Sequence, residues 1–146
     1  MAMASDSHAG SEPSRILIVR LSALGDVIHT LPLLAALRDR YPTATIAWAV
    51  QEQFASLLHG HRAIDELFTV PRGFLKSPRT LWRIRRQLRD LKFDMTIDTQ
   101  GLTKSAVLAW FTKAPRRIGF GGRWGREVSP WLNTELVQPT APHAVD

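Results

Sequence analysis

The stretch that decides the fold is residues 15–26, which read Arg15-Ile-Leu-Ile-Val-Arg-Leu-Ser-Ala-Leu-Gly-Asp26. The first seven residues form a nearly continuous apolar run with β-branched side chains, which is typical of a strand buried on both faces of a parallel sheet. A short turn-like segment follows, and a helical apolar pattern then begins at Val27. The stretch therefore predicts a strand, a turn and a helix, which together open a βαβ unit.

The same alternation continues along the chain. Further strands are predicted at 46–50, 66–70 and 95–99, with a candidate fifth at 117–120, and helices at 51–60, 78–92 and 102–113. Pro32 leaves two interpretations of the first helix open, because it can kink a helix that begins at Asp26 or can start a new helix. Strands that alternate with helices predict an α/β fold with a doubly wound, Rossmann-like parallel sheet.

Length and composition indicate one globular domain. The chain has 146 residues, of which 45% are hydrophobic and 22% charged, and it has no cysteine, which excludes disulfides and zinc–thiolate sites. Residues 1–13 are small and polar, so we expect a disordered tail, and residues 138–146 carry two prolines and resemble a linker. The expected domain is 14–137. No apolar stretch reaches the roughly 18 residues of a membrane span, so a membrane contact would be peripheral.

Positive charge is concentrated in residues 72–92, which contain eight Arg or Lys residues and one Asp, whereas the whole chain carries a net charge of +6. The simplest interpretation is the solvated face of a helix. Solvated faces normally mix charges of both signs, however, so the imbalance favours an anionic partner. Phosphorylated lipid and nucleic acid both fit this pattern.

Two polar clusters follow the first and the fourth predicted strands, where ligands bind in open α/β sheets. They are Ser22, Gly25 and Asp26, and Asp98, Gln100, Gly101 and Lys104. Asp26 and Asp98 can each cap a helix, and Asp26 can alternatively act as a general base. Gly25 permits a tight turn and the close approach of a ligand. Dinucleotide and triphosphate motifs are lacking, and no His, Asp or Glu spacing suits a metal, so we expect neither a cofactor nor a metal.

Taken together, these stretches resemble glycosyltransferase family 9. The resemblance rests on the Gly-Asp-x-x-His-Thr-Leu-Pro core within residues 16–32 and on Ile97-Asp-Thr-Gln-Gly-Leu-Thr-Lys-Ser105. Gly125-Arg-Glu127 and His143-Ala-Val145 also look like the family. The chain departs from the family's His-Ala-Val-Glu-Arg pattern at Asp146, which takes the place of the glutamate.

The resemblance implies the amino-terminal half of a GT-B fold, in which two Rossmann-like domains face a cleft. The first domain would bind the acceptor, Kdo-bearing lipid A, and a second domain beyond residue 146 would bind most of the donor, ADP-heptose. Asp26 matches the family's proposed base for an inverting transfer, and Arg72 and Arg126 match positions thought to meet negative groups of the acceptor. The enzyme would work in the cytoplasm, peripherally at the inner face of the inner membrane, in lipopolysaccharide core synthesis.

The same implications extend to the remaining polar residues of the two clusters, which we expect to bind the acceptor. They are Ser22, Gly25, Asp98, Gln100, Gly101 and Lys104. The isolated chain is expected to lack transfer activity, because it would lack the donor-binding wall of the cleft. Two alternatives remain, a basic nucleic-acid-binding module and a flavodoxin-like nucleotide-binding domain. The first has no recognised motif and leaves the strand-end aspartates without a role.

Overall fold

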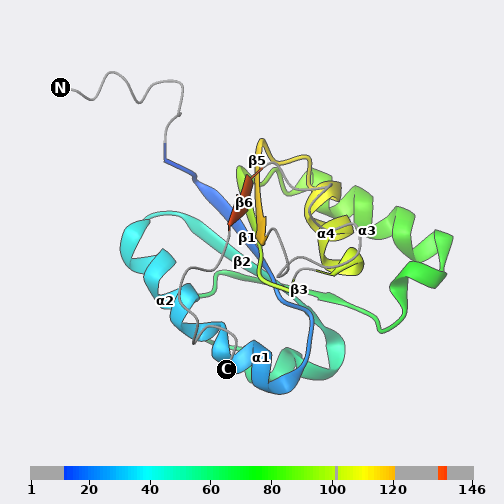
Figure 1. Ribbon diagram of the computed structural model, residues 1–146, viewed down its shortest axis with the longest axis horizontal. Helices are drawn as coiled ribbons and strands as arrows, with labels where there is room; N and C mark the ends of the chain where they lie inside the picture. The colour runs from blue at the N-terminus through cyan, green and yellow to red at the C-terminus, as the bar shows by residue number, and fades with distance from the viewer. Residues whose placement is uncertain (1–11, 101, 121–134, 138–146) are drawn as a thin grey trace.

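A computed structural model describes residues 12–100, 102–120 and 135–137, and it contains a six-stranded sheet with helices on both faces (Figure 1). The strands are β1 (Arg15–Val19), β2 (Thr45–Gln51), β3 (Glu66–Val70), β4 (Met95–Asp98), β5 (Arg116–Phe120) and β6 (Glu135–Val137). The α-helices are α1 (Leu24–His29), α2 (Leu31–Arg40), α3 (Pro78–Asp90) and α4 (Thr103–Phe111). Two short 3₁₀ helices are η2 (Glu52–Leu57) and η3 (Phe74–Lys76).

The strands are all parallel and lie in the order β3-β2-β1-β4-β5-β6. This is the order of a Rossmann-like doubly wound sheet, and it confirms the predicted fold class. Because β1 pairs with β2 on one side and with β4 on the other, the direction of winding reverses between β1 and β4. A flavodoxin-like sheet would place β3 beside β1, so the strand order excludes that alternative.

The central strands β1 and β2 supply alternate side chains to two separate cores. In β1, Ile16 and Ile18 join the cluster beneath α1 and α2, whereas Leu17 and Val19 join the cluster that contains Ile84 of α3. All four β1 side chains are fully buried. This period of two explains why the sequence of β1 is apolar without interruption. Figure 1 shows α3 and α4 together on one face of the sheet and α1 and α2 on the other.

Two helical segments differ from the simplest sequence expectation. The helical segment is interrupted at Thr30, between α1 and α2, and Pro32 lies in the first turn of α2. The interpretation that Pro32 starts a new helix is therefore correct. Proline suits that position because the first amides of a helix have no intrahelical partner. The helix predicted at 51–60 is wrong in type and length, because only Glu52–Leu57 is helical and forms a 3₁₀ turn without buried residues. Within the described ranges, no helix has the length and apolarity needed to cross a bilayer.

Asp94 fixes the start of β1 against the turn that precedes β4. Its Oδ2 accepts hydrogen bonds from the backbone N–H and the hydroxyl of Ser14, both at 2.6 Å, and from the N–H of Arg15 at 2.9 Å. Partial burial raises the pKa of Asp94, but the hydrogen bonds from Ser14 and Arg15 outweigh burial and hold the pKa below the ordinary value of 3.8. The charged form of Asp94 therefore stabilises the fold.

We predict that Asp94→Asn lowers the free energy of unfolding by about 1–2 kcal/mol near neutral pH, because charge-assisted hydrogen bonds are lost. A folded-state pKa below the unfolded value contributes stability above the unfolded pKa, and this contribution disappears as pH falls through the folded pKa. The difference between wild type and variant should therefore shrink as pH falls below about 4, as urea unfolding at several pH values would measure. Asp39→Asn, at an exposed position of α2, is the matched control and should change little. A deficit of Asp94→Asn that stays constant down to pH 2 would contradict the assignment.

Candidate functional site

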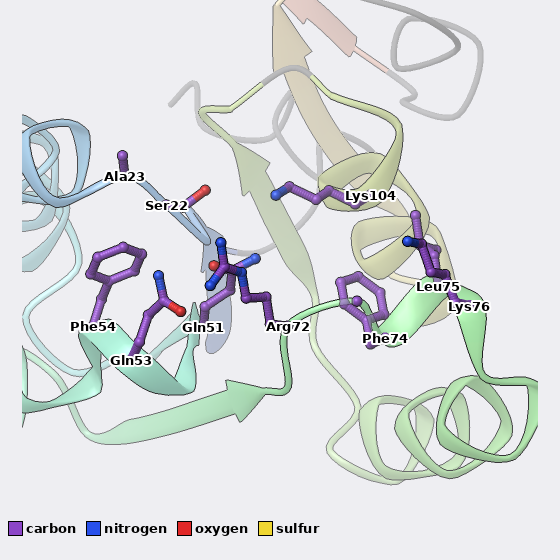
Figure 2. A pocket seen from close by; sticks show the side chains of 11 residues that line it. Ser22, Ala23, Gln51, Gln53, Phe54, Arg72, Phe74, Leu75, Lys76 and Lys104 are labelled. Atoms are coloured by element: carbon purple, nitrogen blue, oxygen red, sulfur yellow. The ribbon is translucent and has the colours of Figure 1, made fainter.

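An open pocket of about 430 Å³ lies at the carboxyl ends of β1, β2 and β3, beside the start of α4. Ser22 follows β1, Gln51 ends β2, Arg72 follows β3 and Lys104 belongs to the first turn of α4. Parallel strands bring these four positions to one edge of the sheet although they are far apart in sequence. Figure 2 shows the Arg72 guanidinium and the Lys104 amine directed into the same space, close to the Ser22 hydroxyl.

The pocket is strongly cationic. Arg72, Lys76 and Lys104 line it, and none of the described residues that line it is acidic. Within the described part of the chain, no carboxylate forms a salt bridge with any of the three cations. Phe54 and Phe74 supply apolar walls on opposite sides, as Figure 2 shows. The pocket therefore suits a ligand that combines negative charge with an apolar or sugar-like body.

Asp26 lies beside this pocket rather than in its lining. It is in the first turn of α1, three residues after Ala23, which does line the pocket. Ala23 occupies the capping position of α1, so the interpretation of Asp26 as the helix cap is wrong. Its Oδ2 instead forms an ion pair with Nη2 of Arg20, and the two atoms are 2.9 Å apart. The Asp26 side chain is 56% exposed. Its Oδ1 accepts no hydrogen bond from any described residue, so this oxygen is open to an incoming hydroxyl.

Arg20 was not singled out from the sequence, yet it connects the two polar clusters. Its side chain is only 14% exposed, and Nη1 donates a 2.6 Å hydrogen bond to the carbonyl of Thr99 while Nη2 pairs with Asp26. Its own carbonyl accepts a hydrogen bond from the indole of the buried Trp48. The sequence does contain a signal for Arg20, which is a charged residue within the apolar run 15–21. A charge that is buried in such a run needs a partner, so Arg20 could have been predicted to form an ion pair.

In the second polar cluster, Asp98 and Gln100 hold the turns around the pocket in place and do not line the pocket. Asp98 is 1% exposed, and its Oδ1 accepts a 3.0 Å hydrogen bond from the N–H of Gln100 in an Asx-type turn. Gln100 Oε1 in turn accepts hydrogen bonds from the N–H groups of Leu21, at 2.7 Å, and Ser22, at 3.4 Å. These contacts tie the turn after β4 to the turn after β1. Asp98 thus positions the loop but offers no surface to a ligand.

The other predicted site residues divide into described and undescribed positions. Gly25 lies inside α1, so its backbone does not form the predicted tight turn, but a Cβ there would meet only open space, and a ligand can approach closely. Gly101 and Arg126 lie outside the described residues, as does the family-like stretch His143-Ala-Val145. Lys76 was counted in the basic segment but not as a pocket residue, because only the folded chain brings it beside Lys104. Across the described ranges, no group of three or more metal-ligating side chains is gathered.

Comparisons with known proteins agree with one another. The model of the family described as Glycosyltransferase family 9 (heptosyltransferase) matches residues 81–146. Lipopolysaccharide heptosyltransferase 1 of Salmonella typhimurium is 35% identical over 128 residues, which cover 80% of this chain. Lipopolysaccharide core heptosyltransferase OpsX of Haemophilus influenzae is 31% identical over 139 residues, which cover 92% of this chain. The chain spans only 38% of the length of either relative.

A solved structure matches the fold as well. The E. coli heptosyltransferase WaaC with ADP-2-deoxy-2-fluoro heptose superposes with a TM-score of 0.73 and 30% identity, over 90% of this chain and 44% of that one. The fold and these comparisons define a Rossmann-like domain of the kind that forms half of a GT-B enzyme. The chain belongs to glycosyltransferase family 9.

We predict that Gln100→Ala lowers the free energy of unfolding by about 1–2 kcal/mol, because the N–H groups of Leu21 and Ser22 lose their acceptor. Gln53→Ala makes the same change at an exposed position of the pocket and should stay within about 0.5 kcal/mol of wild type. Chemical denaturation of both variants measures the difference. Equal stabilities would show that Gln100 does not hold the two turns together.

Proposed function

We propose that this chain is the amino-terminal, acceptor-binding half of a heptosyltransferase of lipopolysaccharide core synthesis. The observation that carries the proposal is the pocket at the strand ends, which Arg72, Lys76 and Lys104 line with no carboxylate among its described lining residues, close along the chain to the exposed Asp26. Relatives named lipopolysaccharide heptosyltransferase 1, and a related structure holding an ADP-heptose analogue, support heptose as the transferred group. Such an acceptor, Kdo-lipid A, would carry the carboxylates and phosphates that cationic pockets bind.

In this proposal Asp26 is the general base. Its carboxylate takes the proton of an acceptor sugar hydroxyl as the hydroxyl oxygen forms a bond to the anomeric carbon of heptose. The bond from that carbon to ADP breaks, ADP leaves with the electron pair, and the configuration at the anomeric carbon inverts. Arg20 holds one oxygen of Asp26 and leaves Oδ1 for the acceptor. Arg20 is therefore a positioning residue in this mechanism.

The cationic side chains of the pocket suggest which substrate each domain would bind. Arg72, Lys76, Lys104 and Ser22 would bind the charged acceptor sugar, and Arg126 would contribute from outside the described residues. The donor diphosphate would bind mainly to a second domain, whose cationic groups and helix dipoles would stabilise the departing ADP without a metal. Because the acceptor is a lipid made inside the cell, we place the enzyme in the cytoplasm, at the inner face of the inner membrane.

Asp26→Asn in the full-length transferase that carries this chain should lower kcat by about 10²-fold or more, because the amide cannot accept the proton. The fold should survive, since the amide oxygen of asparagine can still accept from Arg20, which also keeps its hydrogen bond to the Thr99 carbonyl. Glu52→Gln changes another exposed acid, at the start of η2, and serves as the matched control with near wild-type turnover. A coupled assay for ADP release measures both. An Asp26→Asn enzyme that keeps more than about a tenth of the wild-type rate would remove Asp26 as the base.

Arg72→Ala and Lys104→Ala should each raise the acceptor KM about tenfold and leave the donor KM nearly unchanged, since a charge-assisted contact is lost. Arg62→Ala removes an exposed cation that does not line the pocket and should change neither constant. Steady-state kinetics with each substrate varied in turn separate these effects. If both pocket variants kept the wild-type acceptor KM, the acceptor would bind elsewhere.

A further inference from the structure

The outer face of α3 is a second cationic surface, distinct from the pocket. Arg79, Trp82, Arg83, Arg86 and Arg89 recur at helical spacing and are all exposed, whereas Ile84 and Leu88 on the opposite side are buried in the core. The helix is well defined, because Ser77 caps it through the N–H of Thr80 and Pro78 occupies its first turn. We call the five exposed residues the α3 outer face.

The charges of this face are not neutralised within the described structure. No arginine of the α3 outer face forms a salt bridge with a described carboxylate, although four other arginines of the chain do. Asp90 is the only acidic residue of the helix. Self-repulsion among these arginines costs stability, and an ordinary solvated face would relieve it with acidic neighbours. The arrangement therefore fits an anionic partner.

Apolar side chains accompany the charges. Trp82 is 59% exposed, and the Arg86 guanidinium lies over its ring at 5.3 Å. Leu75 of η3, just before the helix, is 39% exposed. Indole rings and arginines that stand together on a helix are typical of the boundary between lipid headgroups and acyl chains, where both groups gain. A phosphate backbone alone would offer nothing to Leu75.

The α3 outer face also connects directly with the pocket. Leu75 and Lys76 of η3 line the pocket, and one residue, Ser77, separates η3 from the first turn of α3. Figure 2 shows η3 between the pocket and the helix. A surface held at the bilayer by α3 would thus lie beside the pocket that binds the proposed acceptor.

We propose that the α3 outer face is the docking surface of this chain for a bilayer of anionic phospholipid. The arginines contact lipid phosphates, and Trp82 inserts its ring at the level of the headgroups. Docking itself needs only the charges and the indole, whereas its role in delivering a lipid acceptor to the pocket rests on the proposed function.

The test is cosedimentation of the full chain with phosphatidylglycerol vesicles and with phosphatidylcholine vesicles, at about physiological salt. We expect binding to the anionic vesicles alone. Arg79→Gln/Arg83→Gln should weaken it roughly 25-fold, since each surface cation contributes about fivefold. Arg40→Gln/Arg62→Gln removes the same net charge from exposed positions outside α3 and should weaken binding less than about threefold. Trp82→Phe should abolish most of the blue shift of tryptophan emission on binding.

Equal weakening by the two double variants would show that only net charge matters and would overturn the proposal. No binding to anionic vesicles, or tighter binding to DNA than to vesicles, would overturn it as well and would favour a nucleic-acid partner. Because these vesicles contain no acceptor, the outcome is independent of transferase activity. In the full-length transferase, Arg79→Gln/Arg83→Gln should keep wild-type kcat on a water-soluble acceptor without acyl chains, so a failure of the proposed function would appear separately.

Discussion

The guanidinium of Arg20 joins the parts of the molecule on which the site depends. A charge that is almost buried at the end of an apolar strand is costly unless it is paired, and Arg20 pairs with Asp26 on α1 and with the Thr99 carbonyl after β4. Gln100 strengthens the same junction by accepting from the backbone of Leu21 and Ser22. The two turns at the switch point are therefore held as one unit, and the orientation of Asp26 follows from it.

This junction also compensates the charge of a carboxylate that lies close to the pocket along the chain. Asp26 lies three residues after the pocket residue Ala23, and Arg20 compensates its charge. Among the described lining residues, no acid opposes the pocket cations, which are Arg72, Lys76 and Lys104. Because Arg20 compensates its charge, the proposed base Asp26 would repel an anionic ligand of the pocket less than a free carboxylate would.

The sequence predicted the features that depend on local pattern. The apolar run of β1, the stripe of α3 and the two polar clusters at strand ends each leave a periodic or positional signal, and the strand order agreed with the alternation of elements. The sequence did not decide whether Pro32 kinks one helix or starts a second, because proline is compatible with both, so the interruption at Thr30 was not predicted. The contact of Arg20 with the Thr99 carbonyl joins segments 79 residues apart, and neither this contact nor the burial of Asp98 follows from a local pattern.

The two cationic surfaces differ in the kind of recognition they can provide. The pocket is concave, has aromatic walls and brings three cations from different elements together, so its contacts depend on the shape of one ligand. The α3 outer face is convex and its arginines project from a single helix, so it suits any dense anionic surface. Only Ser77 separates η3, which lines the pocket, from α3, so the proposed docking surface would raise the local concentration of lipid headgroups around the pocket. If both proposals hold, weak individual contacts at the pocket would be sufficient, and a product that remains in the bilayer would leave the pocket without the protein leaving the membrane.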